Sequence, residues 1–425
     1  MKLPFTKPKG MKDNFGREAE FFLKLYNLLY DFSIKHGFKY IETPLVENEK
    51  VFTTSLGQTS DVVEKEMFYL KTDERKEKYV LRPENTAPIM RVYLEEGLYS
   101  EPQPLLFFYV GKMYRKENPQ RGRLREFTQW GLEIIGSENA FADFYIIFTG
   151  YKFLKEILNF TEIKVKLNSL GCEKCRPKYK KKLTSYYRRY KNKICHDCQR
   201  RLKENPLRLL DCKNAICQPY KRNAPNILDS LCKFCSLHFQ EIISYLDKTE
   251  INYELDSTLV RGFDYYERTV FEYFLQEDNL ALGGGGRYDL GKVWVNVSTP
   301  AVGLALGLER LKLILEEKGI ELKYSPKPDI FVAYVGEELK IRAFQIIENL
   351  RNEGLNVSFN FFKQSLSHQL EYANKIGVKY VIIVAFEELS KNSVILKDFE
   401  NGTQETISIS KLVNEIKNRL NNKNV

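Results

Sequence analysis

The segment Leu259–Tyr273 brings together side chains that could bind a charged substrate. It places an arginine, a glycine, an aspartate and two tyrosines between apolar residues. Its first two residues predict the end of a buried strand, and the alternation over Thr269–Tyr273 predicts a second strand. Arg261, Tyr265 and Tyr266 would then lie on the turn between these strands and point into the concave side of a sheet. Taken alone, the segment is equally typical of a β-hairpin with two exposed tyrosines.

The cysteines form a second group with a chemically meaningful spacing. All eight lie in four close pairs, which are Cys172 with Cys175, Cys195 with Cys198, Cys212 with Cys217, and Cys232 with Cys235. A close pair places two thiolates on one side of a metal ion, so two pairs complete a tetrahedral site and four pairs predict two structural Zn²⁺ ions. Disulfides are the alternative, but no signal peptide is recognisable in this long chain. The sequence leaves the grouping of the pairs open, and His196 and His238 are second-choice ligands.

The cysteine-containing segment is also strongly basic. Residues 172–235 contain eighteen Lys or Arg and five Asp or Glu, so the rest of the chain carries −3 of the total net charge of +10. Segregated positive charge favours a polyanionic partner such as RNA over a solvated surface that only aids solubility. The basic residues alternate with aromatic rings that could stack on unpaired bases. These rings belong to Tyr179, Tyr186, Tyr187 and Tyr190.

Several secondary-structure elements are expected to position polar side chains. The strand Leu105–Tyr114 leads to Arg115 and Glu117, and a basic loop precedes a second strand over Leu124–Ile135. On this second strand Phe127, Gln129, Gly131 and Glu133 share one face by the period of two. Buried polar side chains on a sheet need partners, so this face is either part of a site or exposed to solvent. A shorter strand at Tyr79–Thr86 presents Glu84 and Thr86 beside Pro83.

The N-terminal part predicts a helix followed by an edge strand. Apolar residues recur at three and four positions over Arg17–Phe38, which is typical of an amphipathic helix. The strand Tyr40–Glu47 contains Pro44, which lacks a backbone donor and therefore belongs at a sheet edge or a subunit contact. Helix and strand together fit a dimer surface, although a buried core helix fits equally well.

These motifs resemble those of the class II aminoacyl-tRNA synthetases. Arg115, Glu117, the basic loop and Phe127 are similar to motif 2, and residues 301–310, which end in Arg310, are similar to motif 3. The N-terminal helix and Pro44 strand resemble motif 1. The segment 259–273 and the run Gly-Gly-Gly-Gly-Arg-Tyr-Asp at 283–289 resemble two signatures of the histidyl-tRNA synthetase family. The resemblance extends over nearly the whole chain.

The resemblance implies an α+β fold with three parts. An antiparallel-sheet class II catalytic domain would occupy residues 1–166 and 240–325, and the basic, zinc-binding insertion would occupy residues 167–239. An α/β anticodon-binding domain would follow over residues 328–425, after a linker at 323–328. The alternation of strands and helices in this last part independently predicts a mixed or parallel sheet covered by helices.

The same resemblance implies ligation of L-histidine to the 3′ end of histidine tRNA, through a histidyl-adenylate made from ATP with Mg²⁺. Arg261, Arg115 and Arg310 are the implied catalytic residues, and all three would act on phosphates. ATP would be bound by Arg115, Glu117, Arg123 and Arg310. Histidine would be bound by Glu84, Thr86, Gln129, Glu133, Tyr265 and Tyr266, with Glu133 and Tyr266 at the imidazole. The insertion would clamp the acceptor arm of the tRNA.

Two features bear on alternatives. Residues 290–298 carry bulky side chains where the family has glycines, and we assign them no ligand. The glycine run at 283–286 predicts a flexible turn if considered alone, whereas beside these motifs it would let a substrate approach the backbone. The first alternative function is a non-charging regulatory subunit of ATP phosphoribosyltransferase, which typically lacks the anticodon domain and the arginine of segment 259–273. The second is a zinc-stabilised nucleic-acid-binding module, which would leave the three arginines unexplained.

Composition limits the remaining possibilities. The 425 residues are 43% hydrophobic and 29% charged, which is ordinary for a globular protein of two or three domains. No run of eighteen apolar residues occurs, so we expect no membrane-spanning helix and a cytoplasmic location. The family resemblance implies a homodimer.

Overall fold

The computed structural model consists of two compact units. One contains residues 1–22 and 40–322, and the other contains residues 23–39 and 323–425. The structure describes residues 4–57, 60, 62–71, 77–275, 281–320, 322, 330–360, 365–399 and 401–421. The expected linker at 323–328 lies outside the described residues.

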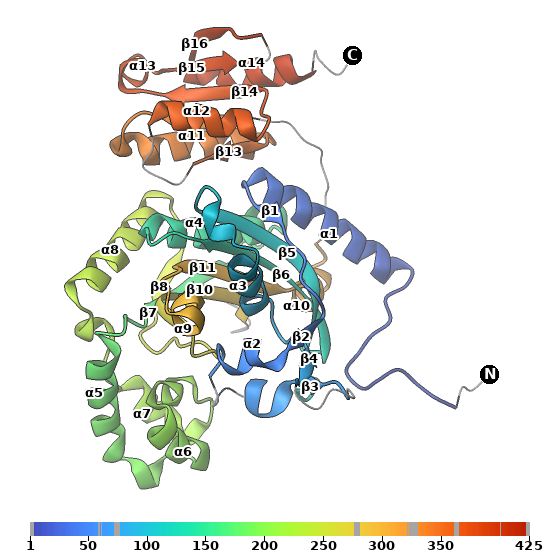
Figure 1. Cartoon of the computed structure of the whole chain (residues 1–425), viewed down its shortest axis with the longest axis vertical. Coiled ribbons are helices and arrows are strands. Elements are labelled where there is room, and N and C mark those ends of the chain that lie inside the picture. The colour runs from blue at the N-terminus through green and yellow to red at the C-terminus, as the bar shows by residue number, and fades with distance from the viewer. Residues whose placement is uncertain are drawn as a thin grey trace. The chain divides into compact units, whose positions relative to one another are not determined.

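The first unit is built on an eight-stranded sheet with the order β1-β5-β6-β11-β10-β9-β7-β8 (Figure 1). In chain order its strands are β1 (Lys39–Tyr40), β5 (Leu105–Tyr114), β6 (Glu126–Ile135), β7 (Ile163–Ser169), β8 (Tyr253–Leu255), β9 (Tyr266–Leu275), β10 (Ala281–Tyr288) and β11 (Ala301–Gly307). In the order of the sheet, the neighbouring strands from β5 to β7 (β5-β6-β11-β10-β9-β7) pair antiparallel, whereas β7 and β8 pair parallel. The predicted strands at 105–114 and 124–135 are confirmed.

One face of this sheet packs against α4 (Ala140–Lys152), whose residues are all buried. Trp130 and Leu132 of β6 are fully buried, and the Trp130 ring lies 4.8 Å from the ring of Phe153. On β10, Arg287 bonds Asp143 of α4, whereas its neighbour Tyr288 bonds Glu133. The two-residue period therefore separates an apolar face under α4 from an opposite face that carries polar groups.

Smaller elements lie beside the polar face. A three-stranded sheet has the order β2-β4-β3, and along the chain α2 follows β2 and α3 follows β4. The bounds are β2 (Val46–Asn48), β3 (Phe68–Tyr69), β4 (Tyr79–Leu81), α2 (Glu49–Thr53) and α3 (Thr86–Glu95). The single strand predicted over Tyr40–Glu47 is wrong, because the chain leaves one sheet at β1 and enters another at β2 on either side of Pro44. Both short strands lie at sheet edges, as a central proline requires.

Two other expectations about strands are wrong. The predicted strand at Tyr79–Thr86 ends at Leu81, and Thr86 begins α3. Leu259 and Val260 are buried but form no strand, so residues 259–265 are an irregular loop that leads into β9, and the segment is not a hairpin. Its predicted second strand, Thr269–Tyr273, is confirmed within β9.

The insertion is a helical lobe, and Figure 1 shows α5, α6 and α7 gathered at one end of α8. Its helices are α5 (Arg176–Arg188), α6 (His196–Glu204), α7 (Gln218–Arg222) and α8 (Lys233–Lys248), with a 3₁₀ turn, η5, at Pro206–Asp211. Tyr179 and Tyr187 are buried in its core. The expectation that these two rings stack on RNA bases is therefore wrong, because they share the inner face of α5 with Leu183.

The remaining helices of the first unit are α1 (Arg17–Lys35), which the division between the units crosses, α9 (Leu290–Val295) and α10 (Leu308–Glu317). The second unit has a five-stranded mixed sheet with the order β13-β12-β14-β15-β16. Its elements are β12 (Ile330–Tyr334), α11 (Lys340–Asn352), β13 (Val357–Phe359), α12 (Leu366–Lys375), β14 (Tyr380–Val384), α13 (Phe386–Ser390), β15 (Ser393–Asp398), β16 (Gln404–Ser408) and α14 (Ile409–Asn421). The mixed sheet predicted for this part is confirmed. Among the helices that the structure describes, none has the length and apolarity needed to cross a bilayer.

Candidate active site and metal centres

A buried carboxylate lies at the centre of the polar face. Glu133 of β6 is 1% exposed, and it accepts hydrogen bonds from Thr86 Oγ1 and Tyr288 OH, each at 2.7 Å. Gly303 is its partner on β11, and a Cβ at that position would overlap the Glu133 carboxylate. Burial raises the pKa of Glu133 to about 8, and nearby Glu84 adds to this while the two hydrogen bonds oppose it.

Glu84 lies beside this carboxylate and binds the backbone N–H groups at the N-terminus of α3. Its two oxygens accept from the backbone N–H groups of Thr86 at 2.7 Å and Ala87 at 3.0 Å. Burial raises the pKa of Glu84, and these backbone hydrogen bonds act in the opposite direction. The first turn of α3 thereby places Glu84 and the Thr86 hydroxyl at one end of the site, where the helix dipole favours negative charge.

Aromatic rings surround the two carboxylates. The rings of Tyr265 and Tyr266 lie 4.5 Å apart, and Tyr265 lies 5.5 Å from Tyr288. On the other side Tyr109 OH donates to Gln129 Oε1 at 3.5 Å. The histidine-binding residues expected from the sequence are thus brought together.

Two of the surrounding tyrosines were missed by the sequence prediction. Tyr288 lies inside the Gly-Gly-Gly-Gly-Arg-Tyr-Asp run, which was recognised without a role for its tyrosine. Tyr109 lies opposite Gly131 in the sheet register, and a Cβ on Gly131 would overlap the Tyr109 ring. The sequence signal that could have identified Tyr109 is its position in strand 105–114, because the neighbouring strand 124–135 carries polar residues on a single face.

Arg115 follows the end of β5, and its guanidinium is held by one hydrogen bond and by contacts with two aromatic rings. Its Nε donates to the carbonyl of Pro83 at 2.9 Å. Its guanidinium carbon lies 5.1 Å from the ring centroid of Phe127 and 5.7 Å from that of Phe263. The two cation–π contacts engage the faces of a permanently charged group, whose edge is the part that can pair with an anion.

Arg261 and Arg310 approach the same region from other elements. Arg261 pairs with Glu272 of β9 and lies 5.8 Å from the ring of Tyr266. Arg310, on α10, donates to the carbonyl of Ala281. Burial lowers the pKa of Arg310, and the positive charges of Arg123 and Arg115 lower it further, whereas Glu272 opposes them.

Arg115, Arg123 and Arg310 therefore share one electrostatic environment. Because Arg310 feels the charges of Arg115, Arg123, Glu117 and Glu272, the groups expected to bind ATP lie close together. Arg123 reaches Glu117 Oε2 at 3.4 Å. A concentration of partly buried positive charge is costly without an anion, which is typical of a polyphosphate site.

The glycine run lies in the central strand β10, so the flexible turn expected for an isolated run is wrong. Gly284 and Gly286 alternate with Tyr288 on the polar face. A Cβ on Gly286 would be 2.9 Å from the Tyr266 ring, and one on Gly284 would be 3.0 Å from Glu272 Cγ. These positions leave the strand backbone bare between the arginines and the tyrosines.

The segment 290–298 forms a short helix, α9, followed by a turn that brings the chain back to Asp289. Asp289 accepts from the backbone N–H groups of Lys292 at 3.0 Å and Thr299 at 2.8 Å. Asn296 ends the helix with a φ of 56°, in the left-handed region. The bulky side chains are accommodated by this local structure, with Trp294 packed against the core beside the site.

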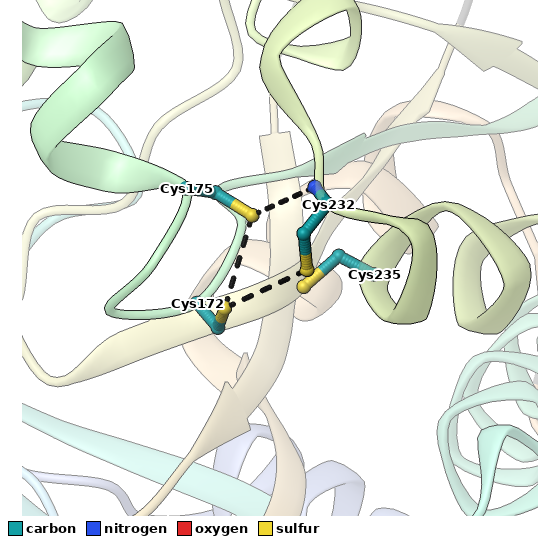
Figure 2. Close-up of side chains that lie close together, drawn as sticks. All are labelled: Cys172, Cys175, Cys232 and Cys235. Atoms are coloured by element: carbon teal, nitrogen blue, oxygen red, sulfur yellow. Dashed lines mark hydrogen bonds between the residues drawn. The ribbon is translucent and has the colours of Figure 1, made fainter.

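The first cysteine group lies where the chain leaves the catalytic sheet for the insertion and where it returns. Cys172, Cys175, Cys232 and Cys235 face one another (Figure 2), with Sγ atoms of the first and second residues 3.8 Å apart and those of the first and third 4.0 Å apart. Four sulfurs bound to Zn²⁺ at about 2.3 Å lie about 3.8 Å from one another. The separation is too large for a disulfide, whose S–S bond is about 2.05 Å.

The second group consists of Cys195, Cys198, Cys212 and Cys217. In each group the sulfur atoms all lie within 4.8 Å of one another. Burial raises the pKa of Cys198 and also that of Cys217, to about 11, so these thiols need a nearby cation to ionise. The grouping is nested, because the outer pairs of the segment form one cluster and the inner pairs form the other.

The second-choice histidine ligands do not join the clusters. His238 Nε2 lies 3.5 Å from Asp143 Oδ2, beneath the sheet. His196 is the first residue of α6, and neither His196 nor His238 belongs to either described cysteine cluster.

An antiparallel sheet that presents arginines from a strand end and from a following helix, joined to a separate α/β domain, is a class II aminoacyl-tRNA synthetase architecture. A family model described as histidyl-tRNA synthetase matches residues 10–173 and 195–311, and one described as anticodon binding domain matches residues 329–419. The chain belongs to the histidyl-tRNA synthetase family.

Individual relatives agree over nearly the full length. A protein named histidine–tRNA ligase from Thermosipho melanesiensis is 41% identical over 405 residues, which cover 94% of this chain and 95% of the relative. One of the same name from Clostridium perfringens is 38% identical, with 96% and 98% covered. The crystal structure of apo S. aureus histidyl-tRNA synthetase matches with a TM-score of 0.61 and 29% identity, covering 97% of this chain and 99% of that one.

Proposed function

We propose that the protein joins L-histidine to the 3′ end of histidine tRNA through a histidyl-adenylate formed from ATP. The observation that carries this proposal is the buried Glu133 carboxylate, which is held by Thr86 and Tyr288 and lies near Tyr266, whose ring is 5.8 Å from the Arg261 guanidinium. An ionised carboxylate can accept the N–H of an imidazole, while the arginines can bind the phosphates of ATP. Amino acid selection and activation thus have adjacent sites.

Histidine selection follows from the hydrogen-bonding groups around Glu133. Glu133 and Tyr266 would hold the ring nitrogens, and Glu84, Thr86 and Gln129 would surround the α-amino group, with Tyr265 supporting Tyr266. A site built to pair with polar substrate groups rejects analogues that lack them by about 10⁴–10⁵ without editing. An amino acid without ring donors would not supply the additional hydrogen bond that the buried carboxylate can accept.

Phosphate chemistry follows from the arginines. Arg115 would bind the α-phosphate and Arg310 the γ-phosphate, while Arg261 would stabilise the charge that develops on the α-phosphate as the histidine carboxylate attacks. Glu117 and Arg123 would complete the ATP contacts. Glu117 and Glu272 supply carboxylate oxygens, the donor type that Mg²⁺ prefers. Mg²⁺ bound with ATP would neutralise the remaining phosphate charge.

The rest of the chain supports the second step. The basic insertion would clamp the acceptor arm of the tRNA, with two Zn²⁺ ions bound by the nested cysteine clusters, and the C-terminal α/β unit would bind the anticodon. The catalytic domain would comprise residues 1–166 and 240–325, the insertion residues 167–239, and the anticodon-binding domain residues 328–425. A homodimer, which the family resemblance implies, and a cytoplasmic location are part of the proposal.

Histidine-dependent exchange of pyrophosphate into ATP tests the proposal directly. The wild type should exchange label only when histidine is present, and it should transfer histidine to histidine tRNA but not to tRNAs of other identity. A protein that binds histidine without exchange would instead behave as the non-charging regulatory subunit. The match to an anticodon binding domain and the retained Arg261 disfavour that alternative.

A further inference from the structure

The loop at residues 259–265, which carries Arg261 and Tyr265 and leads to Tyr266 at the start of β9, has no regular secondary structure of its own. A loop can position catalytic groups only if neighbouring elements hold its backbone. Here the neighbours include the insertion, which contacts the loop at three successive points through η5, Asn205 just before η5, and α5. These contacts assign the insertion a role apart from any contact with tRNA.

The first contact is made by a buried arginine of the insertion. Arg208 of η5 is 5% exposed, and its Nη1 donates to the carbonyl of Gly262 at 2.6 Å. Gly262 follows Arg261 directly, so the bond restrains the backbone next to the proposed catalytic guanidinium. Hydrogen bonds from charged donors are roughly twice as strong as neutral ones.

The second contact lies two residues further along the loop. Asn205, which precedes η5, donates from Nδ2 to Asp264 Oδ1 at 2.9 Å. The backbone N–H of Asp264 donates to the carbonyl of Leu56 at 3.2 Å. Gly57 leaves room for the Asp264 carboxylate, because a Cβ there would overlap it. Asp264 is therefore held between the insertion and residues 56–57 of the catalytic body.

The third contact is made at the start of β9. Arg176 of α5 donates to the carbonyl of Tyr266. Arg176 follows Cys175 of the first cysteine cluster, and Cys212 of the second cluster follows η5 directly. The segments that hold the loop are thus next in the sequence to residues of the two cysteine clusters.

We infer that Arg208, Asn205 and Arg176 are positioning residues for amino acid activation, because they hold the loop that bears Arg261 and the two tyrosines. The inference rests on the proposed function, since the loop matters only if these residues act on histidine and ATP. It requires that removal of one of these hydrogen bonds impair adenylate formation even when no tRNA is present. A purely RNA-binding insertion would leave that step unchanged.

The test uses Arg208→Ala in the full chain, with Arg208→Lys as the conservative variant. Arg222→Ala is the matched control, because Arg222 is exposed on α7 of the same insertion and its removal changes the charge equally. Histidine-dependent pyrophosphate exchange is measured without tRNA, and histidine binding is measured by calorimetry without ATP. Thermal unfolding and zinc content report on folding.

We expect Arg208→Ala to lower kcat/KM for histidine by about ten- to a hundredfold, which is the scale of one missing hydrogen bond to a charged group. Calorimetry should show weaker histidine binding, Arg208→Lys should recover part of both losses, and Arg222→Ala should match the wild type. Asn205→Ala removes a more peripheral contact. If Arg208→Ala does not fold, the same measurements on Asn205→Ala test the inference.

Folded, zinc-replete variants with wild-type histidine binding and exchange would overturn the inference. A wild type that lacks exchange would refute the proposed function instead, and calorimetry would still show whether Arg208 supports histidine binding. The two failures are therefore distinguishable.

Discussion

The carboxylate of Glu133 occupies the space that a side chain on Gly303 would fill. The two residues face each other across β6 and β11, and they are 170 positions apart in the sequence. Position 303 therefore requires glycine, because any side chain there would occupy the space of the carboxylate. Glu133 can accept hydrogen bonds from Thr86 and Tyr288 only while this space stays open.

The Gly303→Ala substitution should displace Glu133 from its two hydrogen-bond donors. We expect kcat/KM for histidine to fall by about 10²-fold, the effect of moving a positioned group by about 1 Å. ATP binding, followed by calorimetry without histidine, should change little because the arginines lie on other elements. An unchanged KM for histidine would show that Glu133 does not determine histidine binding.

The titration of Glu133 predicts that the ligand-free protein is stabilised when this carboxylate is removed. Its pKa is raised from 4.5 to about 8, so the folded state retains a proton between these values that the unfolded state loses. The free energy of unfolding therefore decreases as the pH rises through this range. Glu133→Gln should stabilise the protein by about 1–3 kcal/mol more at pH 8.5 than at pH 5.5.

Urea unfolding at the two pH values measures this difference, and histidine calorimetry should show that the stabilised variant binds histidine poorly. Glu138→Gln is the control, because Glu138 has a side chain that is 58% exposed. The wild type should also bind histidine more tightly as the pH rises from 6.5 to 8.5, because ionised Glu133 is the acceptor. Equal stability differences at both pH values would contradict the raised pKa.

Much of this site could be predicted from local sequence patterns. The period of two in strand 124–135 correctly placed Gln129 and Glu133 on one face, because that alternation depends only on neighbouring residues. The contacts of Gly303 with Glu133 and of Gly131 with Tyr109 could not be predicted, because they depend on the register between strands that are distant in sequence.

The burial of the insertion tyrosines was predictable but was missed. Tyr179, Leu183 and Tyr187 recur every four residues, which indicates one apolar face of a helix. The basic residues between them led to the prediction of an RNA-stacking surface. The nested grouping of the cysteines was not predictable, because it depends on where the chain re-enters the catalytic unit.

Arg261 should contribute to the rate of activation more than to the binding of histidine. Removal of a preorganised donor to a developing negative charge costs about 2.7–4 kcal/mol, or about 10²–10³-fold in kcat. We expect Arg261→Ala to show this loss in pyrophosphate exchange with a smaller change in KM for histidine. Arg261→Lys should remain well below the wild type, because a point charge cannot replace the guanidinium that pairs with Glu272. A defect confined to KM would contradict this role.

The exposed basic residues of α5 and of the position that follows it should act on tRNA alone. Lys181, Arg188 and Arg189 are exposed. Replacing them with Gln should reduce the dependence of log K on log salt by about 0.7–0.9 for each phosphate that the variant no longer neutralises. Filter binding of histidine tRNA between 50 and 200 mM salt, roughly the range over which phosphate binding is strongly salt-dependent, measures the slope. Pyrophosphate exchange without tRNA should stay at the wild-type rate, and an equal loss of exchange would reject a separate clamp.

The nested cysteine clusters predict a specific pattern of metal loss. Wild-type protein should contain about two Zn²⁺ per chain by elemental analysis, one for each set of four thiolates. The double variant Cys172→Ser/Cys232→Ser removes two ligands of one cluster and should retain about one ion, whereas Cys172→Ser/Cys195→Ser damages both clusters and should retain none.

A sequential grouping of the pairs predicts the opposite result for these two variants, so the measurement separates the arrangements without a crystal. Zinc binding to such sites supplies roughly 10–16 kcal/mol of apparent free energy at pH 7, and this free energy becomes folding free energy in a small domain. Removal of each ion should therefore unfold part of the insertion, detected as new protease cleavage between residues 172 and 235. Because that part holds Gly262 and Asp264, metal loss should also weaken histidine binding. Zinc-free protein that resists cleavage and binds histidine normally would contradict both the metal sites and their link to the loop.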